Sequence, residues 1–276
     1  MMRFPRAAIV LAATIAAFTA TSAEAHEFWL EAEDYTIAAG AAIRADLRVG
    51  QEFRGNRLVF DPSRFRRFEI VGPDGALPVD SRLGDRPAVD QTVAAPGAHI
   101  VVHVTTDTVL TYDTLEDFAA FAGMHGLEDR VAEHRARGLP EAEFREVYSR
   151  SVKALIQAGP NDAAQVRDAA LGLPIELVVE GDPYADPTPD SLGVVARLGG
   201  APMSDVVVTV FAKDAEDAVS RFDVRTDAQG RAVVPLERER RYLLNTVHLR
   251  QPEAALADET GAVWESLWAS VTFETD

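Results

Sequence analysis

The residue with the clearest chemical potential is His26, because of the segment that precedes it. Residues 1–25 have the three parts of an export signal: two early arginines, an uncharged apolar run over 7–18, and the cleavage motif Ala23-Glu24-Ala25. Cleavage there would leave a chain that begins at His26. An amino-terminal histidine offers its α-amine and its ring Nδ1 to one metal ion, and a nitrogen-rich site of this kind suits Cu²⁺ or Ni²⁺.

The other histidines are weaker candidates, because a lone histidine is more often structural than a ligand. His103 is four residues after His99 on an expected buried strand, so the two side chains would share one face. His103 is therefore the best additional ligand in the first half of the chain. His125 and His134 are nine residues apart in a region expected to be helical, which puts them on different faces.

Composition excludes several classes of function. The chain has no cysteine, which excludes disulfides, thiolate metal sites and cysteine nucleophiles. Its 27 basic and 44 acidic residues give a net charge of −17, so nucleic acid and anionic membrane surfaces would repel it. G-x-S-x-G, H-E-x-x-H and P-loop motifs are all missing from the sequence, so we do not expect an enzyme. After signal cleavage we expect a protein of the periplasm that is not itself a membrane protein.

The first half of the chain is expected to hold a β-sandwich followed by helices. Residues 26–113 contain short strand-like runs separated by glycine-rich and proline-rich turns, as in an amino-terminal sandwich domain. Residues 114–160 predict a helical insertion. Asp113 or Thr114 would cap its first helix, with Asp117 in the position of a capping box three residues after Thr114, and its second helix would run from about Glu141 to Ala158.

The second half is expected to return to β structure. Residues 161–190 form a connecting segment that contains one strand, and residues 191–276 predict an immunoglobulin-like or prealbumin-like sandwich. In this part, Asp227-Ala228-Gln229-Gly230 predicts a hairpin turn. The expected fold is thus mainly β, with two β-sandwich domains and a helical insertion between them.

Several segments also resemble a known family. They are His26-Glu27-Phe28-Trp29-Leu30-Glu31, Leu47-Arg48-Val49-Gly50-Gln51-Glu52-Phe53, Tyr148-Ser149-Arg150-Ser151-Val152-Lys153-Ala154-Leu155, Gly172-Leu173-Pro174-Ile175-Glu176-Leu177 and the segment from Trp264 to Phe273. The chain resembles a family of bacterial periplasmic proteins catalogued as a domain of unknown function. Some of its members are linked to nickel and cobalt uptake transporters. The resemblance covers essentially the whole mature chain.

The resemblance implies a metal site built around the histidine exposed by cleavage, which matches His26. It also draws attention to the strand that carries His248, which we add to His26 and His103 as a predicted metal residue. His125 departs from the family pattern, either as an added ligand or as a neutral surface variation.

Three functions follow as hypotheses. The first is a periplasmic protein that binds a divalent metal, with nickel favoured and cobalt or copper possible, and delivers it to an inner-membrane uptake transporter. The second is a copper-dependent oxidative enzyme whose histidine brace combines His26 with His103 or His248. The third is an envelope module that binds protein or glycan without metal, for which metal would not change the melting temperature.

Overall fold

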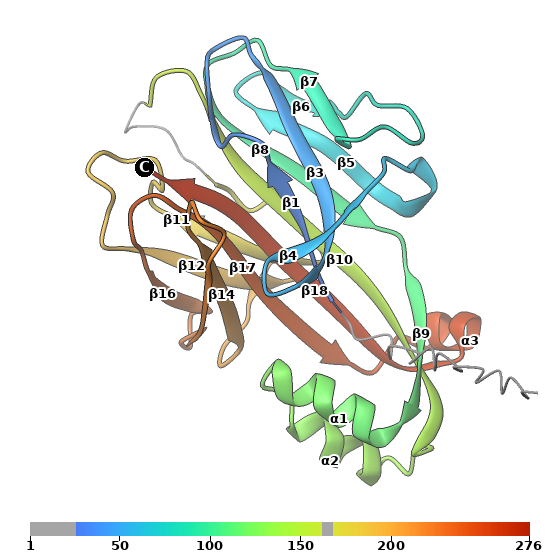
Figure 1. Ribbon diagram of the computed structural model, residues 1–276. Helices are drawn as coiled ribbons and strands as arrows, with labels where there is room; N and C mark the ends of the chain where they lie inside the picture. Colours follow the sequence, from blue (N-terminus) through green and yellow to red (C-terminus); the bar gives the residue numbers. More distant parts are fainter. Residues whose placement is uncertain (1–25, 162–167) are drawn as a thin grey trace, which may run out of the picture.

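A computed structural model describes residues 26–161 and 168–276, so the expected export signal lies outside the described residues. The described chain is mainly β, and its largest feature is a ten-stranded sheet (Figure 1). Two of these strands, β2 (Thr36–Ile37) and β9 (Thr108–Thr114), pair only with β10. The other eight follow one another across the sheet in the order β15 (Val219–Arg225), β14 (Val207–Lys213), β17 (Arg240–Arg250), β18 (Ala262–Thr275), β10 (Ala142–Ala158), β8 (Gly97–Thr105), β5 (Phe65–Gly72) and β6 (Gly75–Pro78).

Two smaller sheets complete the β structure. The first small sheet contains β1 (Glu27–Ala32), β3 (Ala42–Gln51), β4 (Arg54–Leu58) and β7 (Val89–Thr92). The second small sheet contains β11 (Ile175–Glu180), β12 (Ser191–Leu198), β13 (Ala201–Pro202) and β16 (Arg231–Pro235).

The small sheets cover opposite faces of the large sheet. Ser270 of β18 donates a hydrogen bond to the carbonyl of Phe28 on β1 at 2.8 Å, which puts the first small sheet on that face. Val152 is the partner of Ser270 across the β10–β18 pair, and the next residue, Lys153, contacts Glu176 of β11 from the other face. Because successive side chains of a strand point to opposite faces, the large sheet packs against one small sheet on each face. The result is two sandwiches that share one sheet, which confirms the expected fold class.

The expected second helix, Glu141 to Ala158, is wrong: Ala142–Ala158 is strand β10. Its many Ala, Glu and Arg residues favoured a helix, but its last nine residues all have buried side chains except Arg150, so it occupies the centre of the sheet. β10 pairs with β18 in parallel and with β8 and β9 antiparallel. These long-range pairings decide its conformation, because strand preference depends strongly on surroundings.

The helices lie at one end of the large sheet (Figure 1). α1 (Leu115–Met124) begins as predicted, with Thr114 and Asp117 forming a capping box. α2 (Asp129–Ala136) follows, and with α1 it encloses an aromatic cluster against β10, β17 and β18. Short helical segments also occur at Pro62–Arg64 (η1) and at Ala254–Thr260 (α3). None of the described helices combines the length and the apolar character needed to cross a bilayer.

The predicted hairpin at Asp227–Gly230 is also corrected. The turn itself is present, since the amide of Gly230 donates to the carbonyl of Asp227 at 2.9 Å. However, β15 pairs with β14 in the large sheet, whereas β16 pairs with β12 in the second small sheet. The chain therefore crosses from the large sheet to the second small sheet at this turn. There β16 lies beside β12, and its Ala232 and Val234 side chains are buried.

Candidate functional site

His26 lies directly before β1 and is held in the fold through its backbone. The Nη2 group of Arg150 donates a hydrogen bond to the carbonyl oxygen of His26 at 3.2 Å. The ring Nδ1 of His26 is buried, as is Oε2 of Glu27, and neither atom has a hydrogen-bond partner in the part of the chain that the structure describes. Burial raises the pKa of Glu27. The start of β1 therefore has free polar atoms on an anchored backbone.

β1 itself is secured along its length. Ser270 donates to the carbonyl of Phe28, and Thr272 donates to the carbonyl of Leu30 at 2.7 Å. The Trp29 side chain is fully buried, and its ring meets that of Phe53 edge-on at 5.6 Å. The tryptophan is thus part of the core, and these contacts keep the end of the strand from fraying.

Arg150 is the cation at this site. Its guanidinium carbon lies 5.6 Å from the Phe28 ring centre, 4.4 Å from Tyr148 and 5.7 Å from Trp268. It forms no ion pair with any described residue, its Nε is buried without a hydrogen-bond partner, and Glu146 and Glu27 act on it only as more distant charges. Burial lowers the pKa of Arg150. The guanidinium is therefore stabilised by three aromatic rings, by hydrogen bonds to the Tyr148 side chain and the His26 carbonyl, and at longer range by Glu146 and Glu27.

His103 borders the same region from β8. It is buried among three phenylalanine rings, with centre-to-centre distances of 5.5 Å to Phe28, 5.5 Å to Phe65 and 4.7 Å to Phe68. Its Nδ1 has no partner among the described residues, and burial lowers its pKa to about 3. The imidazole is consequently neutral at pH 7, and the Phe28 ring lies between His103 and the backbone that Arg150 holds.

His248 lies on the other face of the large sheet. It is opposite Leu267 in the β17–β18 pair, whereas its neighbour Val247 is opposite Trp268 on the face that carries Ser270. Burial lowers the pKa of His248, with the Arg250 charge adding to the effect. The structure therefore does not bring His248 together with His26. Within residues 26–161 and 168–276, no group of three or more His, Cys, Asp or Glu side chains could hold a metal ion.

His125 is the histidine that the structure adds to the His26 region. It follows α1 and packs on the rings of Phe121 and Trp268, at 5.1 and 4.9 Å. Burial, with Arg221 as a second cause, lowers its pKa to about 4, and Arg221 also acts on Glu27. These contacts exclude an unconstrained surface position. The sequence could not reveal them, because the contact with Trp268 joins residues 143 positions apart.

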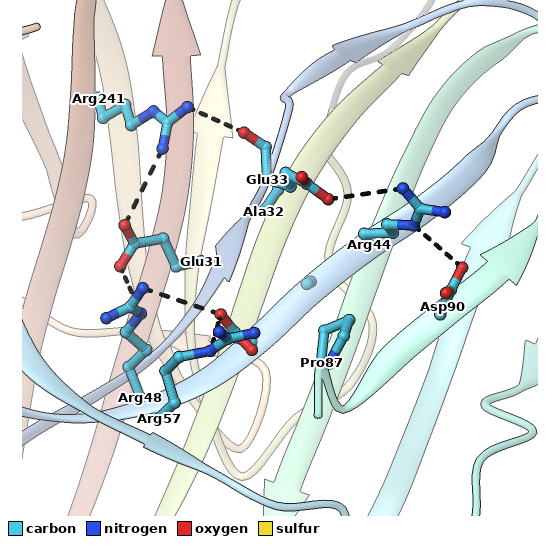
Figure 2. Close-up of a pocket in the computed structure, with 11 residues that line it drawn as sticks. Glu31, Ala32, Glu33, Arg44, Arg48, Arg57, Pro87, Asp90 and Arg241 are labelled. Atoms are coloured by element: carbon cyan, nitrogen blue, oxygen red, sulfur yellow. Dashed lines mark hydrogen bonds and ion pairs between the residues drawn. The ribbon is translucent and has the colours of Figure 1, made fainter. Parts of the chain in front are cut away.

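A second group of charged residues near β1 forms a network of ion pairs. It lines a cavity of about 510 Å³, in which Glu31 pairs with Arg48 at 3.0 Å (Figure 2) and Asp46 pairs with Arg57 at 2.6 Å. Arg241 donates to the Glu33 carbonyl at 2.9 Å. This network joins β1, β3, β4 and β17, and each of its charged side chains has an ion-pair or hydrogen-bond partner within the chain, although the buried Oδ1 of Asp46 accepts no hydrogen bond from a described residue.

Comparison with known proteins places the chain in a family. The family model described as "Domain of unknown function (DUF4198)" matches residues 23–250. The chain belongs to this family. The match extends across both small sheets and to the end of β17, so the DUF4198 region includes His26, Arg150 and His248. A search of the curated proteins finds no match.

Proposed function

We propose that this member of the DUF4198 family is a periplasmic protein that binds a divalent metal ion through His26 and delivers it for uptake. Nickel is the favoured ion, with cobalt and copper as further candidates, and an inner-membrane metal transporter is the proposed recipient. The observation that carries the proposal is the buried Nδ1 of His26, which has no hydrogen-bond partner among the described residues and belongs to a residue whose backbone Arg150 holds.

The donor set has to include the amino terminus. Because the described residues contain no three-residue cluster of ligating side chains, a site requires the α-amine that signal cleavage at Ala25 would create. That amine and Nδ1 of the same residue would chelate one ion, and the anchored β1 would limit the entropy lost on binding. His125 is the favoured additional ligand because it contacts Trp268, whose ring Arg150 also approaches. His103 and His248 stay as predictions from the sequence.

The test compares two forms of the protein by calorimetric titration with Ni²⁺ and Cu²⁺. One begins at His26, as verified by intact mass, and the other has one alanine ahead of His26. We expect one-to-one binding by the first form and a loss of about 100-fold in affinity in the second, because its Nδ1 loses the chelating amine. Equal affinities would overturn the proposal.

Histidine variants then locate the second ligand. We expect His125→Ala to weaken Ni²⁺ binding by about tenfold, with His248→Ala as the matched control on the other face of the large sheet. Thermal melting adds an independent measurement, since metal at 100 times its Kd stabilises the fold by ~2.7 kcal/mol. An unchanged melting temperature would favour the metal-free envelope module instead.

A further inference from the structure

A second cavity, distinct from the charged one in Figure 2, lies between the first small sheet and the large sheet. Its volume is about 460 Å³, within the usual range of small-molecule pockets. The residues that matter for recognition are Phe28, Leu47, Val49, Leu58, His103 and Arg150. We call this cavity the Arg150 pocket.

The walls of the Arg150 pocket are mainly apolar. Leu47 and Val49 of β3 and Leu58 of β4 form one side, and the Phe28 and His103 rings, which contact each other at 5.5 Å, lie deeper. His103 is neutral at pH 7, since burial lowers its pKa to about 3, so it adds no positive charge. A ligand with a flat or branched hydrocarbon body would bury its surface here.

Arg150 differs from the apolar residues of this lining because it carries a charge. Removing a guanidinium from water costs several kcal/mol, which a carboxylate normally offsets. Arg150 forms no ion pair with a described carboxylate, since Glu146 and Glu27 act on it only at longer range, and its buried Nε has no hydrogen-bond partner among the described residues. The other polar groups around Arg150 are already used: its backbone amide donates to Thr105 Oγ1 at 2.9 Å, its Nη2 donates to the His26 carbonyl, and the Tyr148 side chain is a further hydrogen-bond partner.

The other charges at the pocket largely cancel. Asp61 and Arg64 also line it, but Arg64 Nε lies 3.4 Å from Asp61 Oδ2, and Asp61 accepts two further hydrogen bonds from Ser63. The unbalanced charge of the lining is therefore the positive charge of Arg150. Charge complementarity selects an anion, and the apolar walls select the rest of the molecule.

We propose that the Arg150 pocket binds a small amphipathic carboxylate, with its hydrocarbon body among Phe28, Leu47 and Leu58 and its carboxylate on Arg150. This proposal does not rest on the proposed metal function, because the pocket uses neither the α-amine nor the ring of His26 and shares only Arg150 with that site. The occupant is a single small organic anion.

Three probes that differ only in the head group test the proposal by calorimetry on the chain that begins at His26. They are 4-phenylbutyrate, 4-phenylbutan-1-ol and 4-phenylbutylamine, which are anionic, neutral and cationic at pH 7. We expect the carboxylate to bind roughly tenfold more tightly than the alcohol, and the amine not to bind, because only the carboxylate completes the Arg150 guanidinium. Equal binding of all three, or no binding of 4-phenylbutyrate, would overturn the proposal.

A matched pair of variants locates the site. Leu58 lines the pocket and Leu77 lies on β6 outside it, and both side chains are partly exposed, at 37% and 45%. We expect Leu58→Asp to weaken 4-phenylbutyrate binding by roughly tenfold through charge repulsion and lost apolar contact, and Leu77→Asp to leave it unchanged. Equal affinities of the two variants would refute the location.

A cross-check separates this proposal from the metal site. The form with an alanine ahead of His26 should keep its affinity for 4-phenylbutyrate, and Leu58→Asp should keep its affinity for Ni²⁺. Failure of one proposal would thus leave the other intact.

Discussion

Arg150 and Lys153 lie three residues apart on β10, so their side chains leave opposite faces of the large sheet. Lys153 is fully buried, and its Nζ lies 2.7 Å from Asp168 and 3.3 Å from Glu176. Arg150 has no acidic partner among the described residues and rests on aromatic rings. One strand thus carries a fully buried cation and a partly buried cation in different electrostatic surroundings.

The difference separates a structural cluster from the proposed binding site. In the Lys153 cluster the carboxylates are also satisfied by backbone amides: Val179 and Ala169 donate to Asp168, and Leu171 donates to Glu176. The cluster joins β10 to β11 and has no capacity left for a ligand. Beside Arg150, buried polar atoms of His26, Glu27 and Arg150 itself have no hydrogen-bond partner among the described residues. A buried polar group without a partner has a cost that a ligand can remove.

The largest effect should come from breaking the satisfied cluster. Lys153→Met would leave Asp168 and Glu176 buried without their cation, and we expect a loss of about 3–5 kcal/mol in the free energy of unfolding. Urea denaturation measures it. The control is Arg225→Met, which removes an ion pair to the exposed Asp205 and should cost about 1 kcal/mol or less. Similar losses in the two variants would contradict the assignment of a special role to the cluster.

The next effect concerns Glu146, a buried acid on the same face of β10 as Arg150. It accepts hydrogen bonds from Tyr112 at 2.9 Å and from Ser266, and burial raises its pKa from 4.5 to about 7. Between those two pH values the folded state holds a proton that the unfolded state has lost, so this group makes stability fall as pH rises from about 4.5 to 7.

Glu146→Gln should remove that fall. At 1.36 kcal/mol per pKa unit, the variant should gain about 3 kcal/mol relative to the parent between pH 4.5 and pH 8, measured by urea denaturation at both values. Glu143→Gln, an exposed position on the same strand, is the control and should keep the parent's pH profile. If Glu146→Gln also kept that profile, Glu146 would be ionised throughout the range.

Arg150→Met should have the opposite effect to Lys153→Met, with little change in stability and a clear loss of Ni²⁺ affinity. The guanidinium has no ion pair to lose, so we expect the free energy of unfolding to change by about 1 kcal/mol or less. Ni²⁺ affinity should fall about tenfold, because the His26 carbonyl loses its donor. Arg145→Met is the matched control, since Arg145 also donates to a backbone carbonyl, that of Thr260, but at an exposed position. A stability loss as large as that of Lys153→Met would show that Arg150 is structural.

The smallest effect is expected at His103. Because this neutral imidazole already lies among three phenylalanine rings, His103→Phe should change stability at pH 7 by about 1 kcal/mol or less. Ni²⁺ affinity should stay within about twofold of the parent. Calorimetry and urea denaturation provide both measurements. A large loss of affinity would instead make His103 a metal ligand, as predicted from the sequence.

The sequence by itself determined the features that depend on neighbouring residues. The class of fold, the cap of α1 at Thr114, and the alternation that puts His99 and His103 on one face all follow from short-range patterns. The chemical interest of His26 came from its place directly after a cleavage motif, again a local property.

Only the tertiary structure decided the rest. The composition of residues 141–158 predicts a helix, yet the structure has strand β10 there. The strand forms because it pairs with β18, whose partner residues are more than 110 positions away. The same pairing places Arg150 where it donates to the His26 carbonyl, and Lys153 where its Nζ contacts Glu176. No spacing in the sequence predicts either contact. Residues distant in the chain meet when hydrophobic burial joins the sheets, so local propensity cannot specify which polar groups find partners and which stay free for a ligand.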